Sequence, residues 1–238
     1  MAVVRLDGIG KSYGGGAAVL SEISLTLEAG DFCFVTGASG AGKTTLLNII
    51  ALAEEPTSGR LTLFDTEIAA ADRKTRAALR RRIGVVFEGL RLLDHLSAAD
   101  NVGVPLRIAG MLDAEIREHV AEVADWLGIG ERIALFPAAL SPSERRRVAL
   151  ARAVVSRPDL LLADEPLSRV DDETAALLMR AFEQLNRVGT TVLIAAPDSD
   201  LVRRSPHPRL HLEAGRWAGP ENSAKSGPES RPEGRLTS

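Results

Sequence analysis

The stretch "DFCFVTGASGAGKTTLLNIIALA" (31–53) places an apolar run, a glycine-rich turn and a second apolar run in immediate succession. The first run, 31–37, predicts a buried strand because it is continuous in apolar residues and ends in glycine. The second run, 43–53, predicts a helix. A strand that enters a glycine-rich turn and leaves it as a helix is typical of a phosphate-binding loop, so the fold prediction starts here.

The turn itself, "GASGAGKT" (37–44), matches the pattern G-x-x-x-x-G-K-[ST] at every fixed position. Glycines let the backbone curl so that successive N–H groups face phosphate oxygens, and the helix N-terminus adds its dipole. Lys43 is expected to reach the β- and γ-phosphates, and the Thr44 hydroxyl is expected to bind Mg²⁺. The alternative, a glycine-rich turn with an exposed lysine, is disfavoured because the required strand and helix are both predicted. The residues expected to contact the nucleotide here are Gly37, Ala38, Ser39, Gly40, Ala41, Gly42, Lys43, Thr44 and Thr45.

A second apolar run, "LLLADEP" (160–166), ends in two acidic residues. A buried strand would deliver Asp164 to the carboxyl edge of the sheet, where it can hold Mg²⁺ through water. Glu165 could then polarise an attacking water, which makes Glu165 and Lys43 the predicted catalytic pair. The two acids could instead lie at a helix N-cap, but the phosphate-binding turn upstream favours the metal site.

The remaining apolar runs indicate an α/β fold. Residues 82–88 and 190–197 are further candidates for buried strands. Continuous apolar strands separated by helices predict a mostly parallel sheet covered on both faces. In contrast, "AVVRLDGIG" (2–10) and "LSEISLTLEAG" (20–30) alternate more and are joined by a glycine-rich turn, which predicts an antiparallel β flap.

Two further segments set the predicted domain organisation. Residues about 89–157 carry helical patterning, for example at Ile116 and Val120, and predict a helical subdomain inserted between two core strands. Residues 219–238 are rich in glycine, proline, serine and charge, and predict a disordered tail. One nucleotide-binding domain is therefore expected over residues 1–218.

The composition excludes some classes of function. Hydrophobic residues make up 45% and charged residues 26%, and the net charge of -3 gives no basic field for nucleic acid. The single cysteine, Cys33, cannot form an internal disulfide, is expected to be buried, and favours a cytosolic location. No signal segment or apolar run long enough to span a bilayer is present, so any membrane role requires a partner. The basic run 73–82 could contact anionic headgroups, but a solvated helix face is the favoured interpretation.

Taken in order, several motifs resemble those of the ATP-binding subunits of ABC transporters, over about residues 3–215. The resemblance implies a P-loop NTPase fold with a RecA-like core, ATP and Mg²⁺ as ligands, and Tyr13 stacked on adenine. It also implies a head-to-tail homodimer in the ATP-bound state, in which Ser141 and Ser143 at a helix tip complete the partner's ATP site. Besides the phosphate-binding turn, the matching segments are "KSYGGG" (11–16), "GVVFEGLRLLDHLSAADNV" (84–102), "LSPSERRRVALARA" (140–153), "LLLADEPLSRVDDET" (160–174) and "TTVLIAAPD" (190–198).

Within the family, the chain is most similar to the cell-division branch, whose outline is shared with lipoprotein-release and MacB-type export ATPases. This implies an integral membrane permease as partner and a place at the cytoplasmic face of the inner (plasma) membrane. No nucleic-acid partner is expected, because family members linked to nucleic acid usually carry two ATPase domains on one chain. Candidate contacts with the permease are Leu92, Leu93 and Leu96, which could equally be ordinary core.

The chain departs from the family pattern at positions that act in catalysis. Glu88 stands where the family has glutamine; it could ligate a metal but adds negative charge. Pro197 replaces the histidine that contacts the γ-phosphate, and proline has no side-chain donor. Pro142 and Ser143 replace two glycines. Retained Mg-ATP binding with slow hydrolysis is therefore expected, with a non-hydrolysing ATP-dependent scaffold as the alternative.

The altered helix tip still has the pattern of a good helix start. Ser141 is an expected N-cap, Pro142 suits the first helical position, and Glu144 completes a capping box. Arg145 and Arg146 replace two glutamines, while Arg147 matches the family. The arginines could attract an anion across a dimer interface, but a solvated helix face for two of the three is the favoured interpretation.

Overall fold

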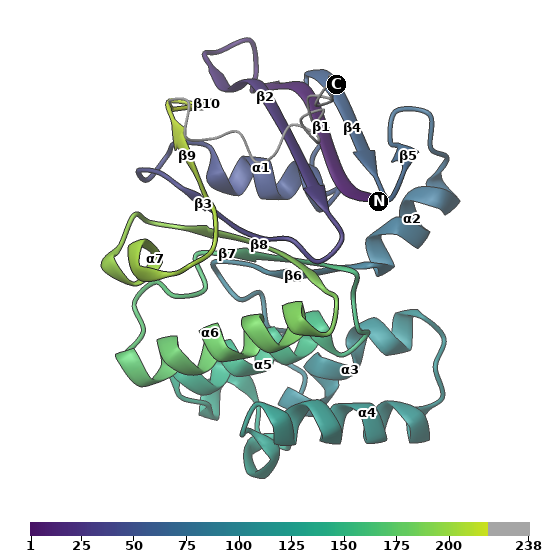
Figure 1. Cartoon of the computed structure of the whole chain (residues 1–238). Coiled ribbons are helices and arrows are strands. Elements are labelled where there is room, and N and C mark those ends of the chain that lie inside the picture. Colours follow the sequence, from purple (N-terminus) through teal and green to yellow (C-terminus); the bar gives the residue numbers. More distant parts are fainter. Residues whose placement is uncertain (219–238) are drawn as a thin grey trace, which may run out of the picture.

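The central sheet is formed by the apolar runs that the sequence predicts as strands. The computed structural model describes residues 1–218, and Figure 1 shows this sheet crossing the middle of the molecule. Four parallel strands lie side by side in the order β3 (Phe32–Thr36), β8 (Thr191–Ala196), β7 (Leu160–Asp164) and β6 (Ile83–Val86). Every residue of β3, β7 and β8 is buried, because layers cover both faces of the sheet. The predicted parallel α/β core is confirmed.

Two later strands extend this sheet beyond β3. β9 (Arg209–Glu213) runs parallel to β3, and β10 (Arg216–Trp217) pairs with β9 in the antiparallel direction. The sequence did not predict these strands, because they are short and alternate between buried and exposed residues at the sheet edge. The predicted disordered tail, 219–238, lies outside the described residues.

A second, antiparallel sheet covers one side of the molecule and confirms the predicted flap. Its strand order is β2-β1-β4-β5, with β1 and β2 paired over most of their length. The third and fourth strands were not predicted, since β4 pairs with β1, which is distant in sequence, and β5 has only two residues. The bounds are β1 (Ala2–Ser12), β2 (Ala18–Glu28), β4 (Ser58–Leu63) and β5 (Thr66–Glu67).

The helices form layers on the two faces of the central sheet (Figure 1). Helix α1 lies between the two sheets, and its apolar side chains pack with those of the flap and with Cys33 and Val35 of β3. Helices α5 and α6 cover the opposite face, where Phe34 is buried. The helices are α1 (Lys43–Ile50), α2 (Arg73–Arg81), α3 (Ala98–Ile108), α4 (Asp113–Trp126), α5 (Pro142–Val154), α6 (Asp172–Arg187) and α7 (Asp200–Arg204), with 3-10 turns η1 (Gly130–Arg132) and η2 (Pro137–Ala139).

Helices α3, α4 and α5 all lie within the interval 89–157, between β6 and β7. The helix predicted from apolar spacing is α4, and Ile116 and Val120 on it are buried as expected. Helix α5 packs against α3 and also against β6 of the core. Figure 1 shows α3 and α4 farthest from the flap, so this part of the chain forms the end of the molecule opposite the antiparallel sheet.

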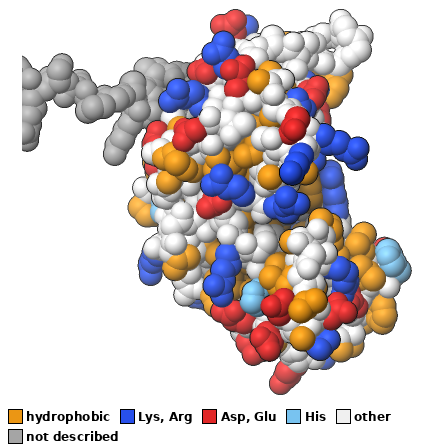
Figure 2. Space-filling model, turned by 90° about the vertical axis from the view of Figure 1, so that its right-hand side faces the viewer, with side chains coloured by type: hydrophobic (Ala, Val, Ile, Leu, Met, Phe, Trp, Pro, Cys, Tyr) orange, Lys and Arg blue, Asp and Glu red, His pale blue; other side chains and the backbone are white. Residues whose placement is uncertain are grey.

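The basic run 73–82 forms α2 on the outside of the molecule. Arg73, Lys74, Arg80 and Arg81 are exposed, which fits the solvated helix face that the sequence favours. Figure 2 looks onto the side that carries α2, and lysine and arginine side chains gather on this face among acidic ones. Over residues 1–218, no helix has both the length and the apolar character needed to cross a bilayer.

The parallel strands place the predicted site residues at one edge of the sheet. Register pairs Thr36 of β3 with Ala196 of β8, and Ala195 of β8 with Asp164 of β7. The phosphate-binding turn, the acidic pair and Pro197 each begin where one of these strands ends. The carboxyl edge of the central sheet is therefore where a ligand is expected to bind.

Candidate functional site

The glycine-rich turn curls between β9 and the flap, in a backbone conformation that requires glycine. Gly37, Gly40 and Gly42 have φ values of 152°, 78° and 106°. A Cβ at Gly37 would lie 2.3 Å from the carbonyl oxygen of Leu212, and one at Gly42 would lie 2.7 Å from Leu20. Residues 38–40 are exposed. The turn therefore packs closely at both ends and leaves its middle open to a ligand.

Lys43 directs its ammonium group into this turn. Its Nζ donates to the carbonyl oxygens of Gly37 at 2.9 Å and Ala38 at 3.1 Å, and lies 3.3 Å from Oε1 of Glu165. The side chain is only 4% exposed. The alternative of an exposed lysine is therefore wrong, and the positive charge lies where phosphates would meet the turn.

Asp164 ends β7 with an incompletely satisfied carboxylate. The residue is buried, its Oδ1 has no hydrogen-bond partner, and the Thr44 hydroxyl hydrogen-bonds its side chain. Burial raises the pKa of Asp164, and the negative charges of Glu88 and Glu165 raise it further, while Thr44 and Lys43 oppose the shift. A buried carboxylate that has one unpaired oxygen favours the binding of a cation, which would neutralise its charge.

The oxygen atoms of Thr44 and Asp164 fit Mg²⁺, which prefers hard oxygen ligands and usually keeps several waters. Within residues 1–218, no group of three or more His, Cys, Asp or Glu side chains could hold a metal by itself. The protein atoms therefore fit a magnesium ion whose remaining ligands are water and the phosphates of a nucleotide.

Glu165 follows Asp164 in a strained backbone conformation. Its φ of 48° lies in the left-handed region, which costs a non-glycine residue ~1–3 kcal/mol. The backbone N–H donates to Ala195 of β8 at 2.8 Å, which holds this turn in place. The backbone therefore leaves the strand at Glu165, and the Glu165 side chain lies against Lys43.

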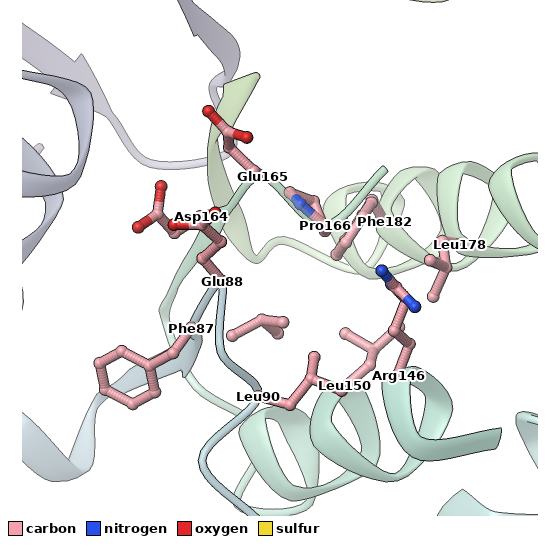
Figure 3. Close-up of a pocket in the computed structure, with 11 residues that line it drawn as sticks. Phe87, Glu88, Leu90, Arg146, Leu150, Asp164, Glu165, Pro166, Leu178 and Phe182 are labelled. Atoms are coloured by element: carbon pink, nitrogen blue, oxygen red, sulfur yellow. The ribbon is translucent and has the colours of Figure 1, made fainter. Parts of the chain in front are cut away.

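Glu88 lies on the loop after β6 and faces the acidic pair. Figure 3 shows Glu88, Asp164 and Glu165 on one side of a small pocket, with Arg146 across from them. Glu88 is exposed and contributes to the raised pKa of Asp164. The negative charges of Glu88 and Glu165 therefore act on Asp164, at the place where the predicted metal and the γ-phosphate would lie.

Tyr13 comes from the flap and reaches the start of α1. Its side chain is half exposed, its hydroxyl donates to Glu54, and it also hydrogen-bonds Thr45. The Lys11 ammonium lies over the ring, 5.0 Å from its centre. The structure thus brings the predicted base-stacking residue next to the phosphate-binding turn.

The start of α5 is capped as the sequence predicts. The Ser141 hydroxyl accepts from the Glu144 N–H at 3.2 Å, and Glu144 accepts from the Ser141 N–H at 2.8 Å, with Pro142 in the first turn. The capping-box prediction is confirmed.

Replacement of Ser141 by alanine is expected to lower the free energy of unfolding by about 1 kcal/mol, because the Glu144 N–H at the helix start loses its side-chain acceptor. Urea denaturation measures the difference. The exposed Ser58 of β4, changed to alanine, is the control and should leave stability nearly unchanged. Equal stability of the two variants would contradict the importance of the cap.

Ser143 makes contacts that the sequence did not predict. Its Oγ lies 2.8 Å from Oγ1 of Thr174, and that hydroxyl donates to Asp171 at 3.0 Å. Asp171 is the N-cap of α6. Ser143 therefore joins the tip of α5 to the start of α6, and no signal in the sequence pairs two hydroxyls so far apart.

The interpretation of two arginines on a solvated helix face is wrong, because all three are at least partly buried. Arg146 donates to the carbonyl oxygen of Ser168 at 2.8 Å, and Arg147 donates to that of Gly128 at 3.1 Å. The Nε atoms of Arg145 and Arg147 are buried without a partner. Through these arginines the tip of α5 contacts Gly128 and Ser168, which leaves the arginine side chains only partly exposed.

Pro197 and the three leucines complete the sequence-predicted set. Pro197 is exposed directly after β8, where its carbonyl oxygen accepts from the Ser199 N–H. Leu92 packs against the buried cluster below the sheet, Leu96 is partly buried, and Leu93 is 39% exposed. Leu93 is therefore the leucine most available to a partner.

Comparison with known proteins agrees with this geometry. Residues 20–168 match the family described as ABC transporter. The cell division ATP-binding protein FtsE of Escherichia coli is 38% identical over 217 residues, which cover 91% of this chain and 98% of that protein. FtsE of Bacillus subtilis is 34% identical over 213 residues, covering 90% and 93%. The methionine import ATP-binding protein MetN of Xanthomonas axonopodis pv. citri is 37% identical over 218 residues, covering 90% and 65%.

A solved structure shows the same fold. The dimeric ATP-binding cassette MJ0796, in a post-hydrolysis state bound to ADP and Pi, has a TM-score of 0.83 and 31% identity to this chain, covering 90% of it and 97% of the cassette. The family match spans the phosphate-binding turn and the acidic pair together. The chain therefore belongs to the ABC transporter family, as an ATP-binding subunit that resembles the FtsE proteins.

Proposed function

We propose that this chain is the ATP-binding subunit of an FtsE/FtsX-like complex. In this proposal Mg-ATP closes a homodimer, and closure is transmitted to an FtsX-like integral membrane permease that acts in cell division and in control of cell-wall hydrolases. The chain would then lie at the cytoplasmic face of the inner (plasma) membrane through that partner. The observation that carries the proposal is the buried Lys43 ammonium between the glycine-rich turn and Glu165, beside the unsatisfied Asp164.

In this proposal different residues bind the phosphates, the Mg²⁺ ion and the adenine of ATP. Backbone N–H groups of 38–42 would surround the phosphates, and Lys43 would exchange its contacts with the turn and Glu165 for phosphate oxygens. Thr44 and Asp164 would hold Mg²⁺. When bound, Mg²⁺ supplies positive charge to the phosphate oxygens. Tyr13 would stack on the adenine, as the family resemblance implies.

The hydrolytic step would depend on Glu165. Once Lys43 turns to phosphate, the carboxylate of Glu165 can accept a proton from water as the water oxygen bonds to the γ-phosphorus. The bond from the γ-phosphorus to the bridging oxygen then breaks, and ADP leaves. The backbone of Glu165 is held by β8, so the base would be positioned before the nucleotide binds.

Three substitutions favour slow hydrolysis. Glu88 adds a negative charge beside Asp164, and Pro197 has no group that can contact the γ-phosphate. Pro142 lacks an N–H at the helix tip that would close on the partner's nucleotide. One missing contact to the transition state costs ~10²–10³ in rate, so turnover well below that of an intact site is expected.

A homodimer is supported by the dimeric state of the similar cassette MJ0796. In that arrangement the α5 tip, with Ser141 and Ser143, would complete the partner's site. The permease would contact the segment after Glu88, where Leu93 is exposed. FtsE proteins are cell division ATP-binding proteins by name, and this similarity is the reason for placing the complex in division.

Two alternative functions differ from this proposal in what ATP is used for. A non-hydrolysing scaffold would use ATP only to clamp the dimer, and Glu88, Pro142 and Pro197 favour it. A LolD- or MacB-type export subunit would couple the same cycle to transport. The retained Glu165 and Lys43 favour an enzyme over a scaffold.

The test pairs ATP binding with turnover, measured on the purified chain alone and with the FtsX-like permease in vesicles. We expect Mg-ATP binding together with phosphate release far slower than one per second, and Glu165→Gln should abolish the release. The chain should float with vesicles that contain the permease and stay behind with empty ones.

Three results would each contradict part of the proposal. Turnover near one per second that Glu165→Gln abolishes would rule out a weakened site. Binding without any phosphate release would establish the scaffold. Flotation with empty vesicles would remove the need for a permease.

A further inference from the structure

The carboxylate of Glu54 contacts three side chains, two from the flap and one from α1. It accepts the hydroxyl of Tyr13 from the flap, and its Oε1 accepts the side-chain amide of Asn48 on α1 at 2.9 Å. The Lys11 ammonium of β1 lies 3.5 Å away. No motif of the family resemblance includes Glu54, and the functional roles above leave it unused.

These contacts hold Tyr13 in one place although half of its side chain is exposed. The ring has a single hydroxyl, and Glu54 is its charged partner. Lys11 lies over one face of the ring at 5.0 Å from the centre and also donates to the Glu55 carbonyl oxygen at 2.7 Å. Lys11 is thereby held over one face of the ring, while half of the Tyr13 side chain stays exposed.

Glu54 also connects the ring to the helix that begins with the phosphate-binding lysine. Asn48 lies on the same helix as Lys43, and Asn48 and Tyr13 bind the two oxygens of one carboxylate. The distance between the stacking ring and the phosphate site is therefore set through Glu54, together with the direct contact of the Tyr13 hydroxyl with Thr45. An aromatic ring fixed at a set distance loses less conformational freedom when a base stacks on it.

We infer that Glu54 is a positioning residue for the purine base, which holds the Tyr13 ring so that its face opposite Lys11 stacks on the base of a bound nucleotide. This inference rests on the proposed ATP-binding function. The inference concerns binding of the base alone, so it can be tested independently of the phosphate contacts of Lys43.

The decisive comparison is between ATP and inorganic tripolyphosphate, which has phosphates and no base. Calorimetric titration with Mg²⁺ should show that Glu54→Ala weakens ATP binding about tenfold, the effect of losing one hydrogen bond to a charged group. Binding of tripolyphosphate should be unchanged. The matched control is Glu55→Ala, because Glu55 is exposed and its side chain pairs with Arg76 of α2.

A double-mutant cycle identifies the route of the effect. Tyr13→Phe keeps the ring and removes the hydroxyl with its contacts to Glu54 and Thr45, so it should weaken ATP binding at least as much as Glu54→Ala does. The two changes together should cost no more than Tyr13→Phe alone. Equal loss for ATP and tripolyphosphate would overturn the inference, because Glu54 would then act through the helix alone. Additive losses would overturn it too. If the unchanged protein binds neither ligand, the proposed function itself fails.

A second readout uses the fact that Tyr13 is the only tyrosine of the chain. The hydrogen bond to the Glu54 carboxylate, with burial, raises the pKa of the Tyr13 phenol above its ordinary value. Formation of tyrosinate, followed by ultraviolet absorbance at alkaline pH, should therefore begin at lower pH in Glu54→Ala and be unchanged in Glu55→Ala. An unchanged tyrosine titration in Glu54→Ala would contradict the contact.

Discussion

Alanine in place of Lys43 is expected to weaken Mg-ATP binding at least ~100-fold, because two charge-assisted hydrogen bonds to phosphate are lost and each contributes ~1.5–3 kcal/mol. The Lys43 ammonium is buried against two carbonyl oxygens of the turn and against Glu165. No other lysine or arginine within residues 1–218 forms a hydrogen bond to this turn. The variant therefore leaves the phosphates opposite the Glu165 carboxylate without the Lys43 ammonium between them.

Calorimetric titration of Mg-ATP into the variant measures this loss. Lys74→Ala is the control, because Lys74 is an exposed residue of α2 and is distant from the turn in sequence. The thermal unfolding midpoint of both variants should be recorded, so that loss of binding is not confused with loss of folding. A correctly folded Lys43→Ala protein that binds ATP as tightly as the unchanged protein would contradict the assigned site.

The parts of the fold that could be predicted from the sequence are those set by local chemistry. β3, β6, β7 and β8 are continuous apolar runs, and burial on both faces explains why the runs are uninterrupted. The turn 37–44 is specified by glycines whose backbone angles no other residue adopts easily. Ser141 and Glu144 cap α5 through contacts three residues apart. In each case the cause lies within a few residues of its effect.

The parts that could not be predicted depend on contacts distant in sequence. Ser143 meets Thr174, and Tyr13 meets Glu54, only because the folded chain brings different elements together. The same reason explains the wrong interpretation of two arginines at 145–147. Their helix tip is polar in sequence, but the neighbouring segments cover it and accept hydrogen bonds from the guanidinium groups.

Reversal of two departures is expected to raise turnover about 10²-fold, since one transition-state contact is worth ~10²–10³ in rate. The variant is Glu88→Gln combined with Pro197→His. Glutamine removes one of the two negative charges that raise the pKa of Asp164, and histidine restores the group that the family uses on the γ-phosphate. Steady-state phosphate release measures the gain, and added Glu165→Gln should remove it.

The structure explains why Glu88 and Pro197 are replaced in this variant while Pro142 and Ser143 are kept. Glu88 and Pro197 are both exposed, so their replacement disturbs no packing. Ser143→Gly would instead break the hydrogen bond to Thr174 and loosen α5 from α6. A control for the charge change is Glu118→Gln, at an exposed position of α4.

A gain that depends on Glu165 would show that the binding site and its base are intact and that the charge and contact at 88 and 197 limit the chemistry. Unchanged turnover with unchanged ATP binding would place the limit at Pro142 and Ser143. Ser143 is bonded to Thr174, and through it to the cap of α6, so the tip could not move toward a partner's phosphate without breaking that bond. ATP would then hold two copies together without being consumed efficiently, and the scaffold would be the better account of this subunit.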